Sequence, residues 1–248
     1  MASSIPFTPS IRNRLLAALP PGSLAKLWPQ LTPVDLELRQ VLHRPEEPIA
    51  TVYFPERGWC SMLAPLEDGD SGEVGLVGWE GVTALPVILG EAFDDLEVMV
   101  QCPGTALSMG ADSLRAAMEG DPVLRTLLLR YVMLHHGQVA RTAACNGRHH
   151  TDQRLARWLL MSHDRAEGDE FPMTHEFLSM MLGVRRAGIT IAAGALQKAG
   201  MISYRGGRMR ITDRPGLESS ACECYGISRR ASERLFGLNA GTRGEYWR

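Results

Sequence analysis

The C-terminal third of the chain spaces its apolar residues first as helices and then as strands. Leu178, Met181 and Leu182 recur at helical spacing, and Gly183 follows where a left-handed residue commonly ends a helix. A second helix is predicted from about Arg185 to Ala199, with an apolar face made of Ile189, Ala192, Ala193 and Leu196. Residues 201–212 predict two strands joined by a Gly206–Gly207 turn. The pattern therefore predicts two short helices, a tight turn and a β-ribbon.

The pattern of the N-terminal half is different. From Leu36 to about Met109, short segments rich in β-forming residues alternate with Gly, Pro and Asp, which predicts an antiparallel roll or barrel. Short helices are expected at residues 10–19, capped by Ser10, and at residues 23–28 and 111–118.

A long helical segment begins at Pro122, and about 24 residues at 1.5 Å per residue give a length of about 36 Å. Its apolar positions form one broad stripe: Leu124, Leu127, Leu128, Tyr131, Leu134 and Val139. We expect this stripe to be buried against a second copy of the helix, with packing inside its own chain as the alternative. Asn146–Gly147 is interpreted as a hinge before a helix at residues 151–164, and residues 165–170 as a polar loop. One or two helices are expected at residues 214–236.

Four motifs of the C-terminal region occur together: Thr174, LGVRR at 182–186, LQKAGMI at 196–202 and QRLARWLL at 153–160. This set resembles the winged helix-turn-helix of the Crp/Fnr family of bacterial transcription regulators. The resemblance implies an α+β fold with an N-terminal antiparallel, cyclic-nucleotide-binding-like β-roll, a long dimerisation helix and a C-terminal winged helix-turn-helix. It divides the chain into the β-roll (1–120), the dimerisation helix (121–146), the DNA-binding domain (147–236) and a flexible tail (237–248).

The resemblance also implies a function, that of a sequence-specific transcription regulator. Such a protein would bind a palindromic operator in double-stranded DNA as a homodimer joined through residues 122–145, and would contact RNA polymerase. The second helix would enter the major groove, where Arg186 is the first candidate for a guanine contact and Arg185 could reach base or phosphate. The other predicted DNA-binding residues line the approach or hold the backbone: Thr174, His175, Ala187, Gly188, Thr190, Arg205 and Arg208.

Charge is divided unevenly along the 248 residues, although the formal total is only −2. Residues 1–140 hold 9 Lys+Arg against 17 Asp+Glu, whereas residues 141–248 hold 17 against 11. Phosphates repel the first part and attract the second. Alone, this asymmetry also fits a solvated surface; together with the motifs it favours DNA binding through the C-terminal half.

The β-roll lacks the residues that hold a cyclic nucleotide in that branch of the family. Ala84–Leu85 stand where a Gly-Glu pair would bind the ribose, and the place of the phosphate-binding arginine is crowded by Asp94, Asp95 and Glu97. Carboxylates repel a phosphate, so we expect an unknown effector other than cAMP, or none. The iron–sulfur branch fits less well, because the first cysteines are the widely separated Cys60 and Cys102.

Two groups of histidines and cysteines are weaker candidates for a metal, haem or redox site. The first is His135, His136, Cys145, His149 and His150; the second is Cys222 and Cys224. Cys145 and His149 are spaced i, i+4, but Asn146–Gly147 is expected to break the helix between them. The cysteine pair is too close in sequence for the usual zinc pair. Solvated or dimer-seam histidines and half-buried thiols are the favoured interpretation, with no metal and no cofactor.

Signatures of enzymes are missing from the sequence, which has no P-loop, GxSxG or HExxH, so we expect no catalytic residues. No apolar run reaches membrane-spanning length, no secretory signal is recognisable, and five scattered cysteines fit reduced thiols. These features favour a cytoplasmic protein. The competing hypothesis is a ligand or redox sensor that signals to a protein partner and retains weak or vestigial DNA binding.

Overall fold

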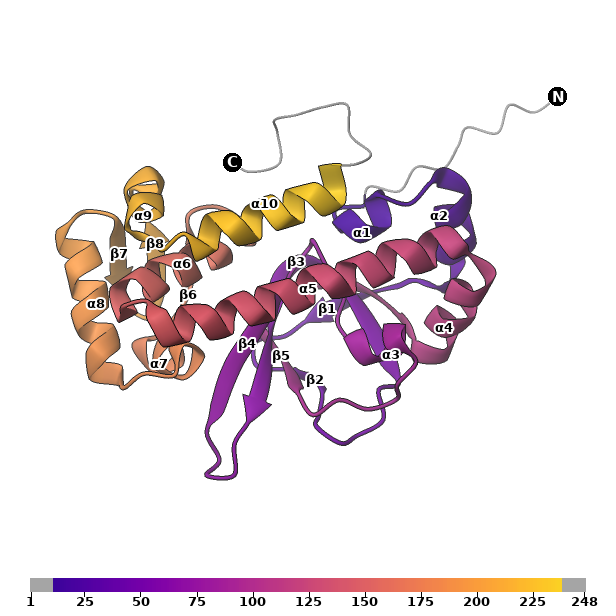
Figure 1. Cartoon of the computed structure of the whole chain (residues 1–248), viewed down its shortest axis with the longest axis horizontal. Coiled ribbons are helices and arrows are strands. Elements are labelled where there is room, and N and C mark those ends of the chain that lie inside the picture. The colour runs from indigo at the N-terminus through magenta and orange to yellow at the C-terminus, as the bar shows by residue number, and fades with distance from the viewer. Residues whose placement is uncertain (1–10, 238–248) are drawn as a thin grey trace.

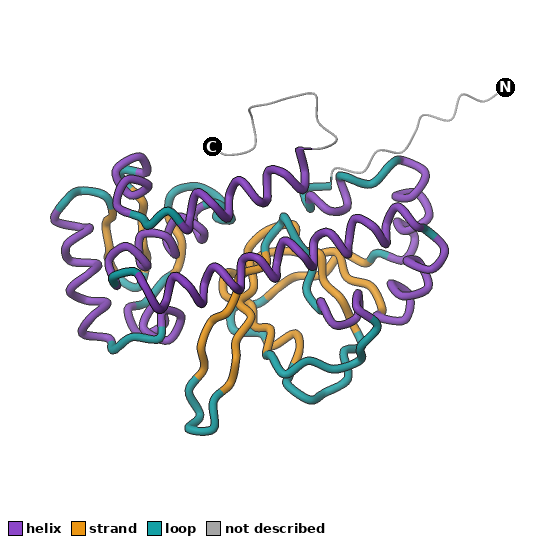
Figure 2. The backbone as a smooth tube through the Cα atoms, in the orientation of Figure 1, coloured by secondary structure: helices purple, strands orange, loops and turns teal. Residues whose placement is uncertain are grey.

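The computed structural model describes residues 11–237. An antiparallel sheet forms one half of the molecule, and helices around a second, small sheet form the other (Figure 1). Helix α5 (Pro122–Arg148) runs along most of the long axis and reaches both halves (Figure 2). This arrangement of an N-terminal sheet, a long helix and a C-terminal helix-turn-helix confirms the predicted α+β fold.

The N-terminal sheet, called the β-roll below, has five strands. They are β1 (Thr32–Leu36), β2 (Val41–His43), β3 (Thr51–Pro65), β4 (Ser71–Val77) and β5 (Glu97–Gly110). Their order is β1-β5-β3-β4, with β2 also paired to β5, and every ladder is antiparallel. The register of the long central pair runs from Thr51 opposite Gly110 to Leu63 opposite Glu97. The closely spaced β-rich segments therefore form the antiparallel roll that the sequence predicts.

Short helices lie beside the β-roll: α1 (Arg14–Ala17), α2 (Pro21–Leu27), the 3-10 turn η1 (Trp28–Gln30), α3 (Leu85–Leu89) and α4 (Ala111–Gly120). The predicted start of the first helix is wrong, because α1 begins at Arg14. Its cap is Asn13, whose side chain accepts from the amides of Leu15 and Leu16 at 3.1 and 3.2 Å. Ser10, the predicted cap, lies outside the described residues.

Helix α5 does not break at Asn146–Gly147, so the predicted hinge is wrong. The helix continues to Arg148, and His149 is the first residue to leave it, with φ −106° and ψ 149°. A glycine inside a helix costs about 1 kcal/mol. At the C-terminal end of α5, Cys145 is fully buried. The packing of this turn of the helix offsets the free-energy cost of Gly147.

The apolar stripe of α5 packs inside its own chain. Leu124, Leu128, Tyr131 and Leu134 are buried in the core that α5 shares with the β-roll. The expectation that the stripe meets a second copy is therefore wrong for these four residues, which pack within the chain; Leu127 and Val139 of the same stripe are half-buried. The large apolar residues that α5 does expose are others: Val123, Leu129 and Met133.

The C-terminal domain (residues 151–220) contains α6 (Thr151–His163), α7 (His175–Leu182), α8 (Arg186–Lys198) and α9 (Arg214–Ser220). Its sheet has the order β6-β8-β7, with β6 (Glu170–Pro172), β7 (Ile202–Arg205) and β8 (Arg208–Ile211). The polar loop predicted at 165–170 is therefore too long by one residue, because Glu170 opens a third strand. Phe171 on that strand is buried in the same core as Leu159 and Ile189.

Buried polar contacts join the C-terminal domain to the β-roll. The Glu73 carboxylate on β4 accepts from Trp158 Nε1 on α6 at 2.7 Å and from Ser61 Oγ at 2.7 Å. Arg165 forms a buried ion pair with Glu80, at 2.6 Å between Nη2 and Oε1. These bonds position the C-terminal domain against the sheet.

A last helix, α10 (Cys224–Gly237), returns along α5. Its Leu235 and Phe236 are part of the same core as Leu15 of α1. The predicted flexible tail begins at Gly237, the last residue of α10, and its other residues lie outside the described part of the chain. Among residues 11–237, none of the helices combines the length and apolar character that crossing a membrane requires.

Candidate nucleic-acid interface

Helices α7 and α8 are set by local signals at the turn between them. Thr174 caps α7 by accepting from the amide of Phe177 at 3.1 Å. Gly183 ends it in the left-handed conformation, with φ 59° and ψ 40°. Arg185 is the N-cap of α8 and has extended backbone angles. The buried side chain of Arg154 on α6 donates a hydrogen bond to the carbonyl of Leu182. Helix α6 therefore also stabilises the turn between α7 and α8.

Helix α8 has one buried face and one exposed face. Ile189, Ala192, Ala193 and Leu196 are buried, as the sequence predicts. Arg185, Arg186, Ala187 and Thr190 are exposed, and Gly188 is half-buried with open space where a Cβ would stand. Figure 1 shows α8 at the outer edge of the molecule. Both guanidinium groups of the first turn are therefore on the surface, away from the core.

His175, the first residue of α7, connects the helices to the β-ribbon. Its ring stacks on Tyr204 of β7, with centroids 4.3 Å apart, and its Nδ1 lies 3.3 Å from Thr190 Oγ1. Burial, and secondarily the charge of Arg186, lowers the pKa of His175. The ring therefore links α7 to both α8 and β7.

The β-ribbon presents a pair of arginines at its tip. Arg205 and Arg208 are opposite each other in the register, next to the Gly206–Gly207 turn, where both glycines have positive φ (58° and 76°). Arg205 is exposed. Arg208 forms an ion pair with Glu170, and the two arginines beside that carboxylate, Arg208 first and then Arg210, lower its pKa.

Two features of this surface were missed by the sequence predictions. Ile191 on α8 is 75% exposed. The sequence held the signal, because Ile189 and Ile191 are about 200° apart on a helix and cannot both face the core. The second feature is Arg210, which is 2.5 Å from Glu170; finding it required the β6–β8 pairing, which joins residues 40 positions apart.

The predicted metal and redox candidates separate into two sets. His135 is buried, its ring lies near Gly75, and burial lowers its pKa to about 4. His136 and His150 are exposed. Cys145 and His149, in contrast, lie beside Cys222 and Cys224, a grouping that the sequence predictions kept apart.

Comparisons with known proteins agree with this geometry. Residues 153–220 match the family profile described as the Crp-like helix-turn-helix domain. No match to the chain is found among curated proteins.

Solved structures of similar fold include FixK2 from Bradyrhizobium japonicum, at 16% identity and a TM-score of 0.65 over 77% of this chain and 98% of that one. A putative transcriptional regulator of the crp/fnr family from Eubacterium rectale has 16% identity and a TM-score of 0.64 over 83% and 96%. TTHB099, a transcriptional regulator of the CRP family from Thermus thermophilus, has 19% identity and a TM-score of 0.63 over 76% and 96%. The resemblance predicted from the sequence is thus confirmed: the chain carries a Crp-like helix-turn-helix domain within the fold of the Crp/Fnr regulators.

Proposed function

We propose that this chain is a sequence-specific, DNA-binding transcription regulator that acts as a homodimer on a palindromic operator. One observation carries the proposal: the first turn of α8 exposes Arg185 and Arg186 on an outer face while the opposite face of the same helix forms the domain core. A helix presented in this way fits the major groove, where arginine recognises guanine through O6 and N7.

The exposed face of α8 supplies the base contacts. Arg186 reads a base, and Arg185 contacts a base or a phosphate. Ala187 and Gly188 allow close approach because they are small. Thr190 and the exposed Ile191 meet thymine methyl groups, since both offer apolar carbon to the groove.

Backbone contacts flank the recognition helix. Thr174 and His175 lie at the start of α7, and Arg205 and Arg208 lie at the tip of the β-ribbon, where cations suit phosphates. Arg205 is the stronger of the two ribbon contacts, because Glu170 already neutralises part of the charge of Arg208.

The dimer uses the exposed face of α5. Leu129 is 40% exposed and Met133 is 66% exposed. Gly137, Ala140 and Ala144 continue the same face and are also exposed. Large residues followed by small ones at spacings of three and four allow two helices to pack closely along their length. Two copies joined in this way present two recognition helices to two half-sites, which requires a palindrome.

The effector, where one exists, is not cAMP. The segment at Ala84–Leu85 forms the start of α3 and offers no carboxylate to a ribose. Asp94, Asp95 and Glu97 precede or open β5 and repel a phosphate. RNA polymerase remains the expected protein partner of a regulator of this kind.

Selection of the preferred site from random DNA duplexes tests the proposal, and the expected product is a palindrome. In fluorescence-anisotropy titrations on that site, Arg186→Ala should weaken binding by about 1–3 kcal/mol and relax one base position in each half-site. Arg44→Ala is the matched control, since it removes an exposed arginine from the β-roll. Unchanged affinity in the Arg186 variant would remove its role as a base contact.

Met133→Glu tests the dimer separately. A carboxylate on each side of the proposed seam should convert the dimer to a monomer in light scattering, and DNA affinity should fall because the half-sites are no longer linked. A variant that remains dimeric would exclude this face of α5 as the seam.

A further inference from the structure

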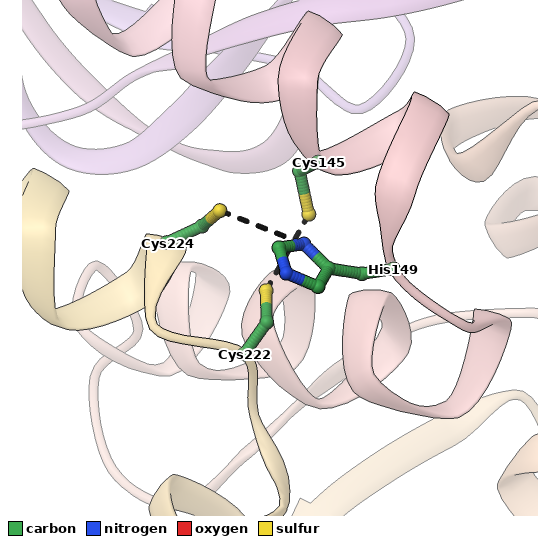
Figure 3. Close-up of side chains that lie close together, drawn as sticks. All are labelled: Cys145, His149, Cys222 and Cys224. Atoms are coloured by element: carbon green, nitrogen blue, oxygen red, sulfur yellow. Dashed lines mark hydrogen bonds between the residues drawn. The ribbon is translucent and has the colours of Figure 1, made fainter.

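Three cysteines and one histidine converge where α5 ends and α10 begins. This Cys3His cluster consists of Cys145, His149, Cys222 and Cys224, and Figure 3 shows the four side chains facing one another. Cys145 and His149 come from the last turn of α5 and the residue after it. Cys222 and Cys224 come from the segment between α9 and the first residue of α10.

The ligand atoms of the Cys3His cluster lie close enough together to bind one metal ion. All lie within 4.8 Å of one another. Cys145 Sγ is 3.5 Å from Cys222 Sγ, and Cys224 Sγ is 3.7 Å from His149 Nδ1. With Zn–S bonds of about 2.3 Å and Zn–N bonds of about 2.0 Å, a tetrahedral site requires S–S and S–N separations of about 3.8 and 3.5 Å. Both observed distances are therefore close to those of a tetrahedral zinc site.

The histidine is oriented by a carboxylate on its far side. While Nδ1 faces the sulfur atoms, Nε2 lies 3.2 Å from Glu223 Oε2. Histidines that bind metals usually donate their other ring N–H to a carboxylate or carbonyl, which fixes the tautomer with a free nitrogen toward the metal. Glu223 is the residue between Cys222 and Cys224, so one short segment supplies two ligands and the group that orients a third.

Charge around the Cys3His cluster complements thiolates. Three thiolates, a neutral imidazole and a divalent ion give a net charge of −1. Arg154 and Arg157 on α6 are buried, and their Nε atoms form no hydrogen bond with any residue between 11 and 237. Buried guanidinium groups are costly unless an anion balances them.

The three cysteines are buried but contribute little to the large apolar cores. They form a small group of their own, with 0%, 4% and 1% of their surface exposed. Four protein ligands in a closed, largely buried arrangement are typical of structural zinc sites, whereas catalytic sites keep a position open for water.

We propose that the Cys3His cluster is a structural Zn²⁺ site that ties the end of the long helix to the C-terminal domain and α10. The ion links residues that are 77 positions apart in the chain. It fixes the direction in which the C-terminal domain leaves α5, and thus the orientation of α8 relative to the dimer seam. Binding deprotonates the thiols and releases their protons to solvent.

Metal analysis of the full chain, purified without a histidine tag, is the direct test. We expect about one zinc per chain in the parent and in Cys102→Ser, which removes a cysteine outside the cluster. Loss of zinc is expected in Cys222→Ser and His149→Ala, whereas His149→Cys should restore it with a fourth thiolate. Glu223→Ala should keep the stoichiometry but weaken zinc affinity by about 10–100-fold in a chelator competition.

Cobalt substitution keeps the test decisive if a variant folds poorly. Co²⁺ added to the metal-free parent should give the d–d bands of a tetrahedral ion and thiolate-to-cobalt charge-transfer bands, and zinc should abolish both. Any of four results would overturn the proposal. The parent could bind neither ion, or Cys222→Ser could hold as much zinc as Cys102→Ser. The purified protein could instead contain iron with acid-labile sulfide, or mass spectrometry could find a Cys145–Cys222 disulfide. DNA binding is measured separately, so the zinc site and the proposed regulatory function can fail independently.

Discussion

The outer and inner faces of the C-terminal domain both carry arginines, but their surroundings differ. On the outer face, Arg185, Arg186 and Arg205 are exposed and form no ion pair within the described residues. On the inner face, Arg154 and Arg165 are buried; the first holds the carbonyl of Leu182 and the second pairs with Glu80. The positive charge of the C-terminal half is thus divided between a surface available to phosphates and a junction that holds the domain in place.

This difference shows why a count of charges is a weak measure of DNA binding. A guanidinium group that is buried in an ion pair cannot reach solvent or a DNA phosphate. Its removal leaves an unpaired carboxylate inside the protein. An exposed guanidinium group changes the free energy of folding little. It can bind a DNA phosphate and thereby release counterions from the DNA. Mutations on the two faces should therefore separate stability from DNA affinity.

The largest effect is expected at the buried ion pair. Arg165→Ala leaves Glu80 buried without its partner and should destabilise the protein by about 3–5 kcal/mol, measured by urea unfolding. Arg186→Ala is the matched control on the outer face, and its urea midpoint should equal that of the parent. If both variants unfold at the parent midpoint, the two faces do not differ in the way the structure indicates.

A smaller effect, dependent on pH, is expected at Glu73. Burial raises its pKa from 4.5 to about 7, although Ser61 and Trp158 donate to it. The folded state therefore holds this proton more tightly than the unfolded state. The resulting stability is complete below about pH 4.5 and is lost as the pH rises through about 7.

Glu73→Gln removes this titration and keeps an oxygen for Trp158. Relative to the variant, the parent should lose on the order of 3 kcal/mol between pH 4.5 and pH 8, measured by urea unfolding across that range. Parallel pH profiles for parent and variant would show that the buried carboxylate keeps its ordinary pKa.

The ribbon arginines sharpen the comparison on the outer face alone. Arg205→Ala should weaken binding to all DNA sequences alike and reduce the slope of log affinity against log salt by about 1. Arg208→Ala should reduce it by less, because Glu170 pairs with that side chain. Equal slopes for the two variants would show that DNA displaces the Glu170 contact without cost.

The smallest effect is expected from Glu170→Gln. It releases Arg208 and Arg210 from their ion pairs, so DNA affinity should rise a few-fold at low salt and the gain should vanish at high salt. Arg205→Ala combined with Glu170→Gln provides the control, since the gain should persist without Arg205. A fall in affinity would show that Glu170 orients the arginines instead of competing for them.

The α7–turn–α8 unit was predictable because its signals are local. Thr174, Gly183 and the apolar positions of α8 act within a few residues, and the predicted limits Arg185 and Ala199 fall one residue outside the helix ends. Strand β6 was missed because three residues carry little periodicity, and their partner strand begins 38 positions later. The face of α5 was misjudged because its spacing shows which residues share a stripe but not what covers that stripe.

The sequence by itself determined the order of the longer elements, the Crp/Fnr type of the C-terminal domain and the exposure of its first-turn arginines, because caps, glycine turns and helical spacing act over short distances. Only the tertiary structure decided what covers the apolar stripe of α5, which arginines are paired and that Cys145, His149, Cys222 and Cys224 come together. Those outcomes depend on contacts between residues tens of positions apart, and spacing along the chain does not specify which distant segments meet.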